Sequence, residues 1–460
     1  MSLAPTLPAS ATADPAEREA RRTDRSGHPG ATPDLVVAAR TVDDVRDTLA
    51  WAYAHRVPVV PRGAGTGLAG GAAVAQGIVL DLSGLDTIES IDPLDLTADV
   101  EPGVLTADLD RAADAHGLCY APDPASAAIS TIGGNIATNA GGMRCVKYGV
   151  TRDAILGLDV VLADGRRIRT GRRTAKGVAG LDLTSLFVGS EGTLGVIVGA
   201  TVRLTPRPQE VATVAASFVG VAEAADTCAA LVGRRLRPSM LELLDAATLA
   251  VIDRHQGTSL SDGAGALVLA QVDGPGTGDQ LAALEDVLRG RAVRWESSRD
   301  PAIAADLLTA RRLALPSIEA EARPLIEDIC VPRSRLAEAV DRIAGISAEH
   351  DVPIFTFAHA GDGNLHPIIA PRRGPEDSGP EDSGPEGTGS AGTPPEAVAA
   401  ADAVFALALE LGGTVTGEHG VGLLKREWLA REVGPDALET QRAIKRALDP
   451  RSILNPGKAF

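Results

Sequence analysis

"VVPRGAGTGLAGGA", residues 59–72 of a 460-residue chain, determines which α/β fold the protein can adopt. Successive backbone N–H groups can point into one concavity here, because no Cβ intervenes at Gly63, Gly65, Gly67, Gly70 and Gly71. The spacing of Gly65, Gly67 and Gly70 also matches the GxGxxG dinucleotide fingerprint. That fingerprint needs a helix to begin within the loop. The next segment, "GIVLDL", predicts a strand instead, so the Rossmann interpretation fails and a nest of N–H groups suited to a diphosphate remains.

Two further glycine-rich stretches follow, "STIGGNIATNAGGMRCVKYG" (130–149) and "GSEGTLG" (189–195). Three loops of small residues in one half of the chain indicate a long, extended ligand that is held along its length by backbone. A dinucleotide of the FAD type is long enough for this role, and a single phosphate is not.

Composition narrows the classes of function. The net charge of −17 argues against nucleic acid, whose phosphates would be repelled. The four cysteines form no CxxC pair, which excludes an iron–sulfur ligand set and favours a reducing cytoplasm. No apolar run is long enough to cross a bilayer.

The order of segments predicts an α+β protein of at least two domains. Residues 1–33 mix acids and arginines without an apolar core, so we expect them to be disordered. Strand–helix–strand patterns begin at residue 34, and "ILGLDVVLADGRRIRT" (155–170) predicts a hairpin. After Pro208 the pattern changes to helical periodicity with scattered strands, which indicates a domain boundary. The decaying repeat at 374–395 predicts a disordered insertion.

Four motifs occur together in this order: "PRGAGTGLAGGA", "PDPASAAISTIGGNIATNAGG", "LFVGSEGTLGVI" and the terminal "ILNPGK". They resemble flavoproteins of the vanillyl-alcohol oxidase type, within the group of D-lactate dehydrogenase, the glycolate oxidase flavin subunit and D-2-hydroxyglutarate dehydrogenase. The resemblance runs from about residue 34 to the end. It implies a two-part FAD-binding domain (34–208), an α+β cap domain with an antiparallel sheet (209–415), and a C-terminal segment (416–460) that completes the active site and returns to the FAD domain.

The resemblance also implies which residues contact FAD. The diphosphate would be wrapped by Arg62, Gly63, Ala64, Gly65, Thr66, Gly67 and Leu68. The flavin would be lined by Pro122, Asp123, Ser126, Gly133, Gly134, Thr138, Gly141 and Gly142. Glu191 and Ile197 would lie near the ribityl and adenine parts, and Asn455 of the terminal motif joins the set. No histidine lies between 59 and 72 to attach FAD covalently, so we expect non-covalent FAD.

A second site is predicted at "HAGDGNLH", residues 359–366. Strand patterns on both sides of the turn bring His359 and His366 to one face, where they can hold a divalent metal together with a third ligand. "GEHGVG" (417–422) offers Glu418 and His419, and its glycines permit the irregular backbone that lets both face one pocket. We predict His359, His366 and Glu418 as ligands of a divalent metal, zinc being the expected ion. His419 then remains as general base.

Metal-dependent members of the resembled group carry HxGDGNxH and GEHG in these roles, with Asn364 facing the substrate. The resemblance implies a small D-2-hydroxy acid or glycolate as substrate. Its carboxylate would be bound by Arg311 of "ARRLALPS", with Arg312 as the second choice. Ile326 stands where relatives specific for hydroxyglutarate carry a lysine, which favours D-lactate or glycolate.

Electrons must leave the reduced flavin to an external acceptor, because the chain has neither a haem motif nor cluster cysteines. A quinone, a cytochrome, an electron-transfer flavoprotein or an iron–sulfur subunit would serve. The expected location is the cytoplasm, either free or at the membrane through the acceptor, and a homodimer is compatible with the sequence. The alternatives left open are a metal-independent FAD oxidase of another alcohol or sugar, a metal-dependent hydrolase, and a non-catalytic binding protein.

Overall fold

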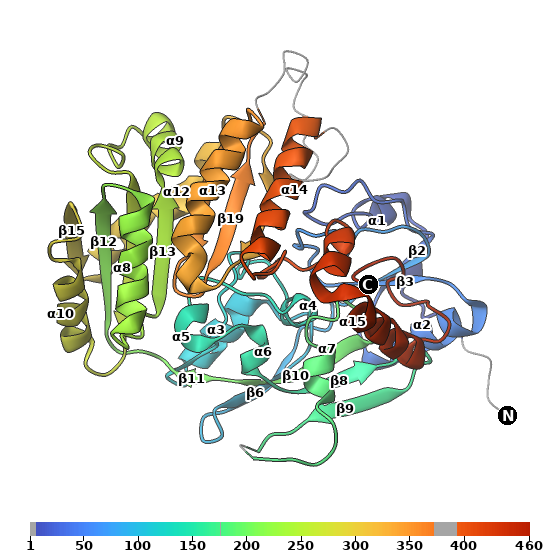
Figure 1. Cartoon of the computed structure of the whole chain (residues 1–460). Helices are drawn as coiled ribbons and strands as arrows, with labels where there is room; N and C mark the ends of the chain where they lie inside the picture. The colour runs from blue at the N-terminus through green and yellow to red at the C-terminus, as the bar shows by residue number, and fades with distance from the viewer. Residues whose placement is uncertain (1–5, 175, 372–392) are drawn as a thin grey trace.

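The computed structural model describes residues 6–174, 176–371 and 393–460 (Figure 1). The insertion predicted at 374–395 lies outside the described residues except for 393–395, and Pro395 is the first residue of helix α14 (Pro395–Glu410). No helix among the described residues is both long and apolar enough to span a membrane.

The N-terminal half begins with the predicted strand–helix–strand arrangement. Helix α2 (Val42–His55) starts at Thr41, whose hydroxyl accepts from Asp44 N while the Asp44 carboxylate accepts from Thr41 N. Its sheet has the order β1-β2-β4-β3, with parallel pairing among β2 (Leu35–Ala38), β4 (Ile78–Asp81) and β3 (Val59–Arg62). The glycine loop therefore runs from one parallel strand, β3, toward the next strand, β4, without an intervening helix.

A second sheet of the same half is antiparallel, in the order β5-β6-β10-β8-β9. The predicted hairpin is confirmed as β8 paired with β9. The strands are β5 (Ile88–Asp92), β6 (Thr97–Val100), β8 (Ile155–Val161), β9 (Arg167–Gly171) and β10 (Val196–Arg203), and the short pair β7 (Leu118–Cys119) and β11 (Thr205–Pro206) lies beside them. The helices are α3 (Thr106–Asp114), α4 (Ile132–Thr138), α5 (Cys145–Tyr148), α6 (Thr151–Ala154) and α7 (Leu183–Phe187).

The prediction that residues 1–33 are disordered is wrong for residues 6–33. They form β1 (Ala11–Thr12), which pairs with β2, and α1 (Pro15–Glu19). Arg21 forms an ion pair with Asp81 at 2.7 Å, and Asp24, 3% exposed, accepts a hydrogen bond from Ala72 N of the glycine loop. The segment lacks an apolar core of its own but is ordered by polar contacts with the neighbouring sheet.

The C-terminal half is built on a large antiparallel sheet in the order β15-β12-β14-β13-β18-β19-β16, with β17 also paired to β19 (Figure 1). Its strands are β12 (Val211–Phe218), β13 (Met240–Asp245), β14 (Ala266–Asp273), β15 (Arg294–Ser298), β16 (Leu325–Ile326), β17 (Ile329–Cys330), β18 (Ile354–His359) and β19 (Asn364–Ile369). The predicted α+β class with an antiparallel cap sheet is confirmed.

Helices cover both faces of this sheet. One apolar core joins it to α8 (Val221–Gly233), α10 (Thr277–Leu288), α13 (Leu336–Glu349) and α14. The core on the other face joins the sheet to α9 (Ala246–Gln256) and α12 (Thr309–Glu319). Helix α11 (Pro301–Leu307) directly precedes α12 in the chain. Because side chains alternate along a strand, Met240, Glu242 and Leu244 of β13 share the face that α9 and α12 cover.

The end of the chain returns to the first half. Helix α15 (Arg426–Leu448) has a kink at Gly434 and Pro435. Beyond it, Leu454 bridges to Val59 of β3, and Asn455 N donates to Val59 O at 2.8 Å. The C-terminal segment therefore lies against the strand from which the glycine loop starts.

Candidate active site

The β18–β19 hairpin carries two histidines. His359 pairs with Asn364 and Phe357 pairs with His366, so the imidazoles are diagonal neighbours on adjacent strands. Their Nε2 atoms are 3.4 Å apart. Asp362 lies in the turn between the strands, where its Oδ1 accepts from Asn364 N at 3.2 Å. The sequence prediction that the hairpin brings both imidazoles together is met by this geometry.

The segment 416–420 meets this hairpin as irregular backbone. Asp328, which is fully buried, lies between β16 and β17, and its Oδ2 accepts four hydrogen bonds. The donors are Thr416 Oγ1 (2.7 Å) and the N–H groups of Gly417 (2.8 Å), Glu418 (3.0 Å) and His419 (2.9 Å). Convergence of three successive N–H groups on one oxygen is incompatible with a strand. This turn lets both Glu418 and His419 reach the hairpin.

Glu418 Oε1 lies 3.0 Å from His366 Nε2 and 3.5 Å from His359 Nε2. The ligand atoms of His359, His366 and Glu418 all lie within 4.8 Å of one another. Two imidazoles and one carboxylate at this separation form a donor set that suits zinc and related divalent ions. The residues present therefore fit a metal, and we call these three the His/Glu cluster.

Electrostatics within the His/Glu cluster favour opposite charges. Burial alone would raise the pKa of Glu418, but hydrogen bonds and positive charge from His359 and His366 hold it well below its ordinary value. Burial likewise opposes protonation of His359, but Glu242 and Glu418 raise its pKa well above the usual range. The carboxylates thus favour a positive charge in this largely buried site.

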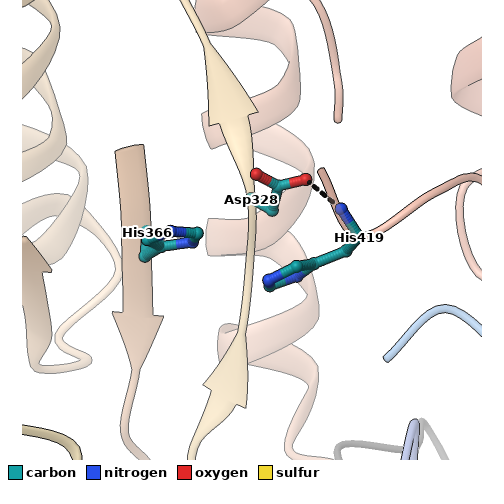
Figure 2. A group of neighbouring side chains, drawn as sticks. All are labelled: Asp328, His366 and His419. Atoms are coloured by element: carbon teal, nitrogen blue, oxygen red, sulfur yellow. Dashed lines mark hydrogen bonds between the residues drawn. The ribbon is translucent and has the colours of Figure 1, made fainter. Parts of the chain in front are cut away.

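His419 lies beside the cluster, with its ring stacked on that of His366 at 5.3 Å between centroids (Figure 2). Burial lowers the pKa of His419 to about 4, although the charge of Asp328 acts in the opposite direction. The uncharged ring is therefore the favoured form near pH 7, and it has a nitrogen lone pair that can accept a hydrogen bond. Asp328, His366 and His419 also form a second set of potential ligands within 4.8 Å.

Arg311 and Arg312 face different surroundings. Arg311 Nε donates to Glu242 Oε2 at 2.8 Å, and Glu242 Oε1 lies 2.6 Å from His359 Nδ1. Arg312 turns instead to its own helix region, where it donates to Ala305 O and Thr309 Oγ1. Of the two predicted arginines, Arg311 is therefore the one that lies next to the cluster.

The glycine stretches reach the same place. A Cβ added to Gly141 would lie 2.5 Å from Glu418 Oε2, and one added to Gly417 would lie 2.1 Å from Asn364 Oδ1. Asn364 Oδ1 is buried and has no hydrogen-bond partner among the described residues. The second glycine stretch, the hairpin and the 416–420 turn thus enclose one site.

The first glycine loop offers free donors. Within the described part of the chain, the backbone N–H groups of residues 64–71 have no hydrogen-bond acceptor. A Cβ at Gly63 would lie 2.4 Å from Thr131 Oγ1, so the loop packs against the first turn of α4. A run of unpaired N–H groups in a small-residue loop fits a diphosphate, and in this respect the residues present fit FAD.

Three predicted cofactor residues have other roles in the fold. Glu191 is buried and accepts from Val421 N and Gly422 N, both at 2.8 Å. Asn455 Nδ2 donates to Gly71 O and Glu191 O. These contacts fasten the C-terminal segment to the glycine loop. Ile197 lies in the apolar core of the second sheet. Contacts of these three residues with FAD stay predictions.

The remaining predicted flavin residues lie between α3 and α5. Asp123 Oδ1 accepts from Arg144 N at 3.1 Å, and burial raises the pKa of Asp123 to about 7. A Cβ at Gly142 would clash with Asp123 O at 2.3 Å. Thr138 Oγ1 donates back to Gly134 O within α4. Pro122, Ser126 and Gly133 belong to the same loop and helix.

Sequence reasoning missed Glu242 and Asp328. Each is an acid inside an apolar stretch, Glu242 in "MLELLD" of β13 and Asp328 in "LIEDICVP" between β16 and β17, and each is fully buried. A charged residue in such a segment is rarely buried without a partner. That signal could have marked both residues, but it does not name the partner.

Comparison with known proteins gives consistent similarities. A family model described as "FAD binding domain" matches residues 33–171, and one described as "FAD linked oxidases, C-terminal domain" matches residues 207–459. Glycolate oxidase subunit GlcD of Bacillus subtilis is 43% identical over 93% of this chain and 89% of that protein. D-lactate dehydrogenase of Anaerostipes hadrus is 33% identical over 93% and 90%.

Solved structures share the fold at low identity. The structure of p-cresol methylhydroxylase with substrate bound has a TM-score of 0.76 at 17% identity and covers 98% of this chain and 93% of that one. Alkyldihydroxyacetonephosphate synthase has a TM-score of 0.73 at 19% identity, covering 98% and 82%. These neighbours bear out the expected vanillyl-alcohol oxidase-type architecture.

Proposed function

The chain belongs to the family of FAD-linked oxidases, and on that premise we propose that it oxidises D-lactate or glycolate to the 2-oxo acid. It is an FAD-dependent hydroxyacid dehydrogenase, as the names of its relatives indicate, and the predicted resemblance to the D-lactate dehydrogenase and glycolate oxidase group is confirmed. The preference for these two monocarboxylic acids over a dicarboxylic hydroxy acid rests on residue 326. Ile326 is apolar and packs against the α9 and α12 core, so it offers no charge to a second carboxylate.

One observation carries the proposal. Glu418 of the His/Glu cluster lies directly against Gly141 of the segment that we predict to line the flavin, and His419 lies beside the cluster. A hydroxy acid bound between the His/Glu cluster and the predicted flavin segment would have the cation, the base and the redox cofactor on different sides. Neither a hydrolase nor a metal-free oxidase would need all three.

We propose that residues 62–68 and the 122–142 segment hold FAD without a covalent bond, and that His359, His366 and Glu418 hold zinc. When bound, FAD supplies at N5 the acceptor for the hydride leaving the substrate Cα. The divalent ion supplies a Lewis acid that lowers the barrier to loss of the hydroxyl proton.

The side chains of this chain perform the rest. Arg311 binds the substrate carboxylate through its Nη groups, which orients the Cα–H bond. Neutral His419 accepts the hydroxyl proton, so that one proton and one hydride leave together and a C=O bond forms. Asn364 presents its unpaired Oδ1 toward the same space. Orientation by these groups supplies most of the rate.

The proposal extends to surroundings and organisation. We propose a cytoplasmic enzyme, free or membrane-associated through its acceptor, because the four cysteines are free among the described residues. The electron acceptor is a separate molecule, for which a quinone, a cytochrome, an electron-transfer flavoprotein and an iron–sulfur subunit remain candidates. We also propose that the chain consists of an FAD-binding domain (34–208), a cap domain (209–415) and a C-terminal segment (416–460) that completes the active site.

The test is anaerobic reduction of the bound flavin. D-lactate or glycolate should bleach the flavin absorbance of the zinc-loaded protein within seconds, and L-lactate should not. His419→Asn should retain the flavin spectrum but bleach 10²- to 10⁴-fold more slowly, as expected for loss of a general base. A colourless protein would refute the proposal. Equal bleaching after chelation would replace it with a metal-independent FAD oxidase.

A further inference from the structure

Glu242 is an acid buried in the middle of a strand. Its side chain is 0% exposed, and its strand neighbours Leu241 and Leu243 are buried too. Burying a carboxylate without partners costs several kcal/mol per charge, about the scale of a domain's whole stability. Glu242 must therefore be matched by specific contacts.

Both oxygens of Glu242 have one partner each, and both partners belong to the site. Oε1 lies 2.6 Å from His359 Nδ1, across the β13–β18 pair in which Glu242 and His359 are directly opposite. Oε2 accepts from Arg311 Nε at 2.8 Å. The guanidinium of Arg311 and the ring nitrogen of His359 thus give each carboxylate oxygen a partner inside the buried site.

The first contact selects the tautomer of His359. A carboxylate only accepts, so His359 keeps a hydrogen on Nδ1, and Nε2 is the nitrogen that gives up its proton when a metal binds. Nε2 is the atom that lies 3.4 Å from His366 Nε2 and 3.5 Å from Glu418 Oε1. A carboxylate behind a ligating histidine fixes the ring orientation and raises the basicity of the ligand atom.

The second contact fixes Arg311. Its guanidinium is held at Nε by Glu242 and lies over the Phe357 ring, 4.2 Å from the centroid. In the described ranges of the chain, the Nη atoms of Arg311 have no hydrogen bond. The outer edge of the guanidinium is thus free to bind a carboxylate in bidentate fashion.

We propose that Glu242 is a positioning residue that orients the metal ligand His359 and the substrate arginine Arg311 with a single carboxylate. It touches neither substrate nor metal, and this role rests on the proposed function. The cation and the substrate carboxylate are then held at a fixed separation, because their two protein ligands share one rigid strand residue.

Glu242→Gln tests the idea because an amide cannot serve both partners. If its oxygen faces Arg311, its NH₂ faces His359 Nδ1, which drives the hydrogen of the imidazole to Nε2 and blocks the ligand atom. If the amide flips, His359 keeps its tautomer and Arg311 Nε meets an NH₂ group. Either orientation damages one half of the site while keeping the side-chain volume.

The experiment measures zinc binding to the chelated, FAD-loaded protein by calorimetry, followed by steady-state kinetics with D-lactate or glycolate. We expect the Kd of Glu242→Gln for zinc to rise 10- to 100-fold, the range for lost outer-shell partners. At saturating zinc, KM should rise more than kcat falls. Asp245→Asn is the matched control. Asp245 lies on the same strand, and its carboxylate accepts from Thr248 N to cap α9, so the substitution removes a carboxylate that contacts neither His359 nor Arg311.

The outcomes separate the two proposals. No zinc binding by the wild-type protein would sink the proposed metal-assisted function. Wild-type binding with an unchanged Kd in Glu242→Gln, or an equal weakening in Asp245→Asn, would overturn the role of Glu242 alone. If Glu242→Gln does not fold, ¹⁵N-histidine spectra of the wild-type protein decide. Zinc should shift the Nε2 resonance of His359, which is assigned by its absence from the spectrum of His359→Gln. A shift that shows coordination through Nδ1 would overturn the inference.

Discussion

Replacing Asp328 with Asn should unfasten the turn that presents Glu418 and His419. Asp328 Oδ2 accepts four hydrogen bonds of 2.7–3.0 Å at full burial. A bond to a charged acceptor is worth about 1 kcal/mol more than one to a neutral acceptor, so the substitution weakens the turn by about 4 kcal/mol. Part of this loss is offset, because the neutral Asn side chain avoids the free-energy cost of burying a charge.

The pKa of Asp328 indicates which is larger in Asp328→Asn, the loss from weaker hydrogen bonds or the gain from removing a buried charge. Burial raises the pKa of Asp328, but the positive charges of His419, when it is protonated, and of Lys425 outweigh that effect and depress the pKa, so the folded protein favours the charged carboxylate over a neutral group. We therefore expect a net loss of about 2 kcal/mol, roughly 4–8 °C in the Tm of a cap domain of this size. Misplacing the catalytic groups by about 1 Å should lower kcat by about 10²-fold.

The assay pairs calorimetric Tm with kcat measured through an artificial dye acceptor at saturating zinc. Glu327→Gln is the matched control, since its carboxylate is also buried, accepts none of the four bonds and has a pKa that burial raises. It should change kcat less than threefold. If Asp328→Asn kept wild-type Tm and kcat, the four-donor turn would not be what orients the two residues.

Three further results are expected. Chelation should abolish turnover but leave the flavin spectrum intact, with recovery on adding zinc; release of flavin on chelation would contradict separate sites. Gly141→Ala should push the Glu418 carboxylate away, since the new Cβ would lie 2.5 Å from it, and should weaken zinc binding at least tenfold by calorimetry. Gly345→Ala, where a Cβ meets nothing within 4 Å, should leave zinc binding unchanged, and equal effects of the two would refute this reasoning. Arg311→Met should raise KM for the hydroxy acid 10²-fold or more, while Arg312→Met should raise it less than twofold; the reverse order would show that the arginines were wrongly assigned.

Much of this protein follows from local sequence alone. Glycines at 63–71 followed at once by a strand excluded the Rossmann fold, and the structure has β3, the loop and β4 in that order. "HAGDGNLH" predicted a hairpin with both histidines on one face, because turn residues and strand formers act over a few residues. The His/Glu cluster could be predicted because its members are chemically distinctive and framed by glycines.

Tertiary structure alone decided what surrounds these motifs. Residues 6–33 lack an apolar core, yet they are ordered because Arg21 finds a partner on β4 and Asp24 finds one in the glycine loop, both much later in the chain. In the sequence, Glu242 and Asp328 are each recognisable only as an acid in an apolar stretch. Their partners lie 69–117 and 88–91 residues away, respectively, and a hydrogen bond between such positions exists only after the sheet has assembled. Local pattern names the groups that act on a substrate, whereas the buried charges that hold them are identified by contacts that no local pattern contains.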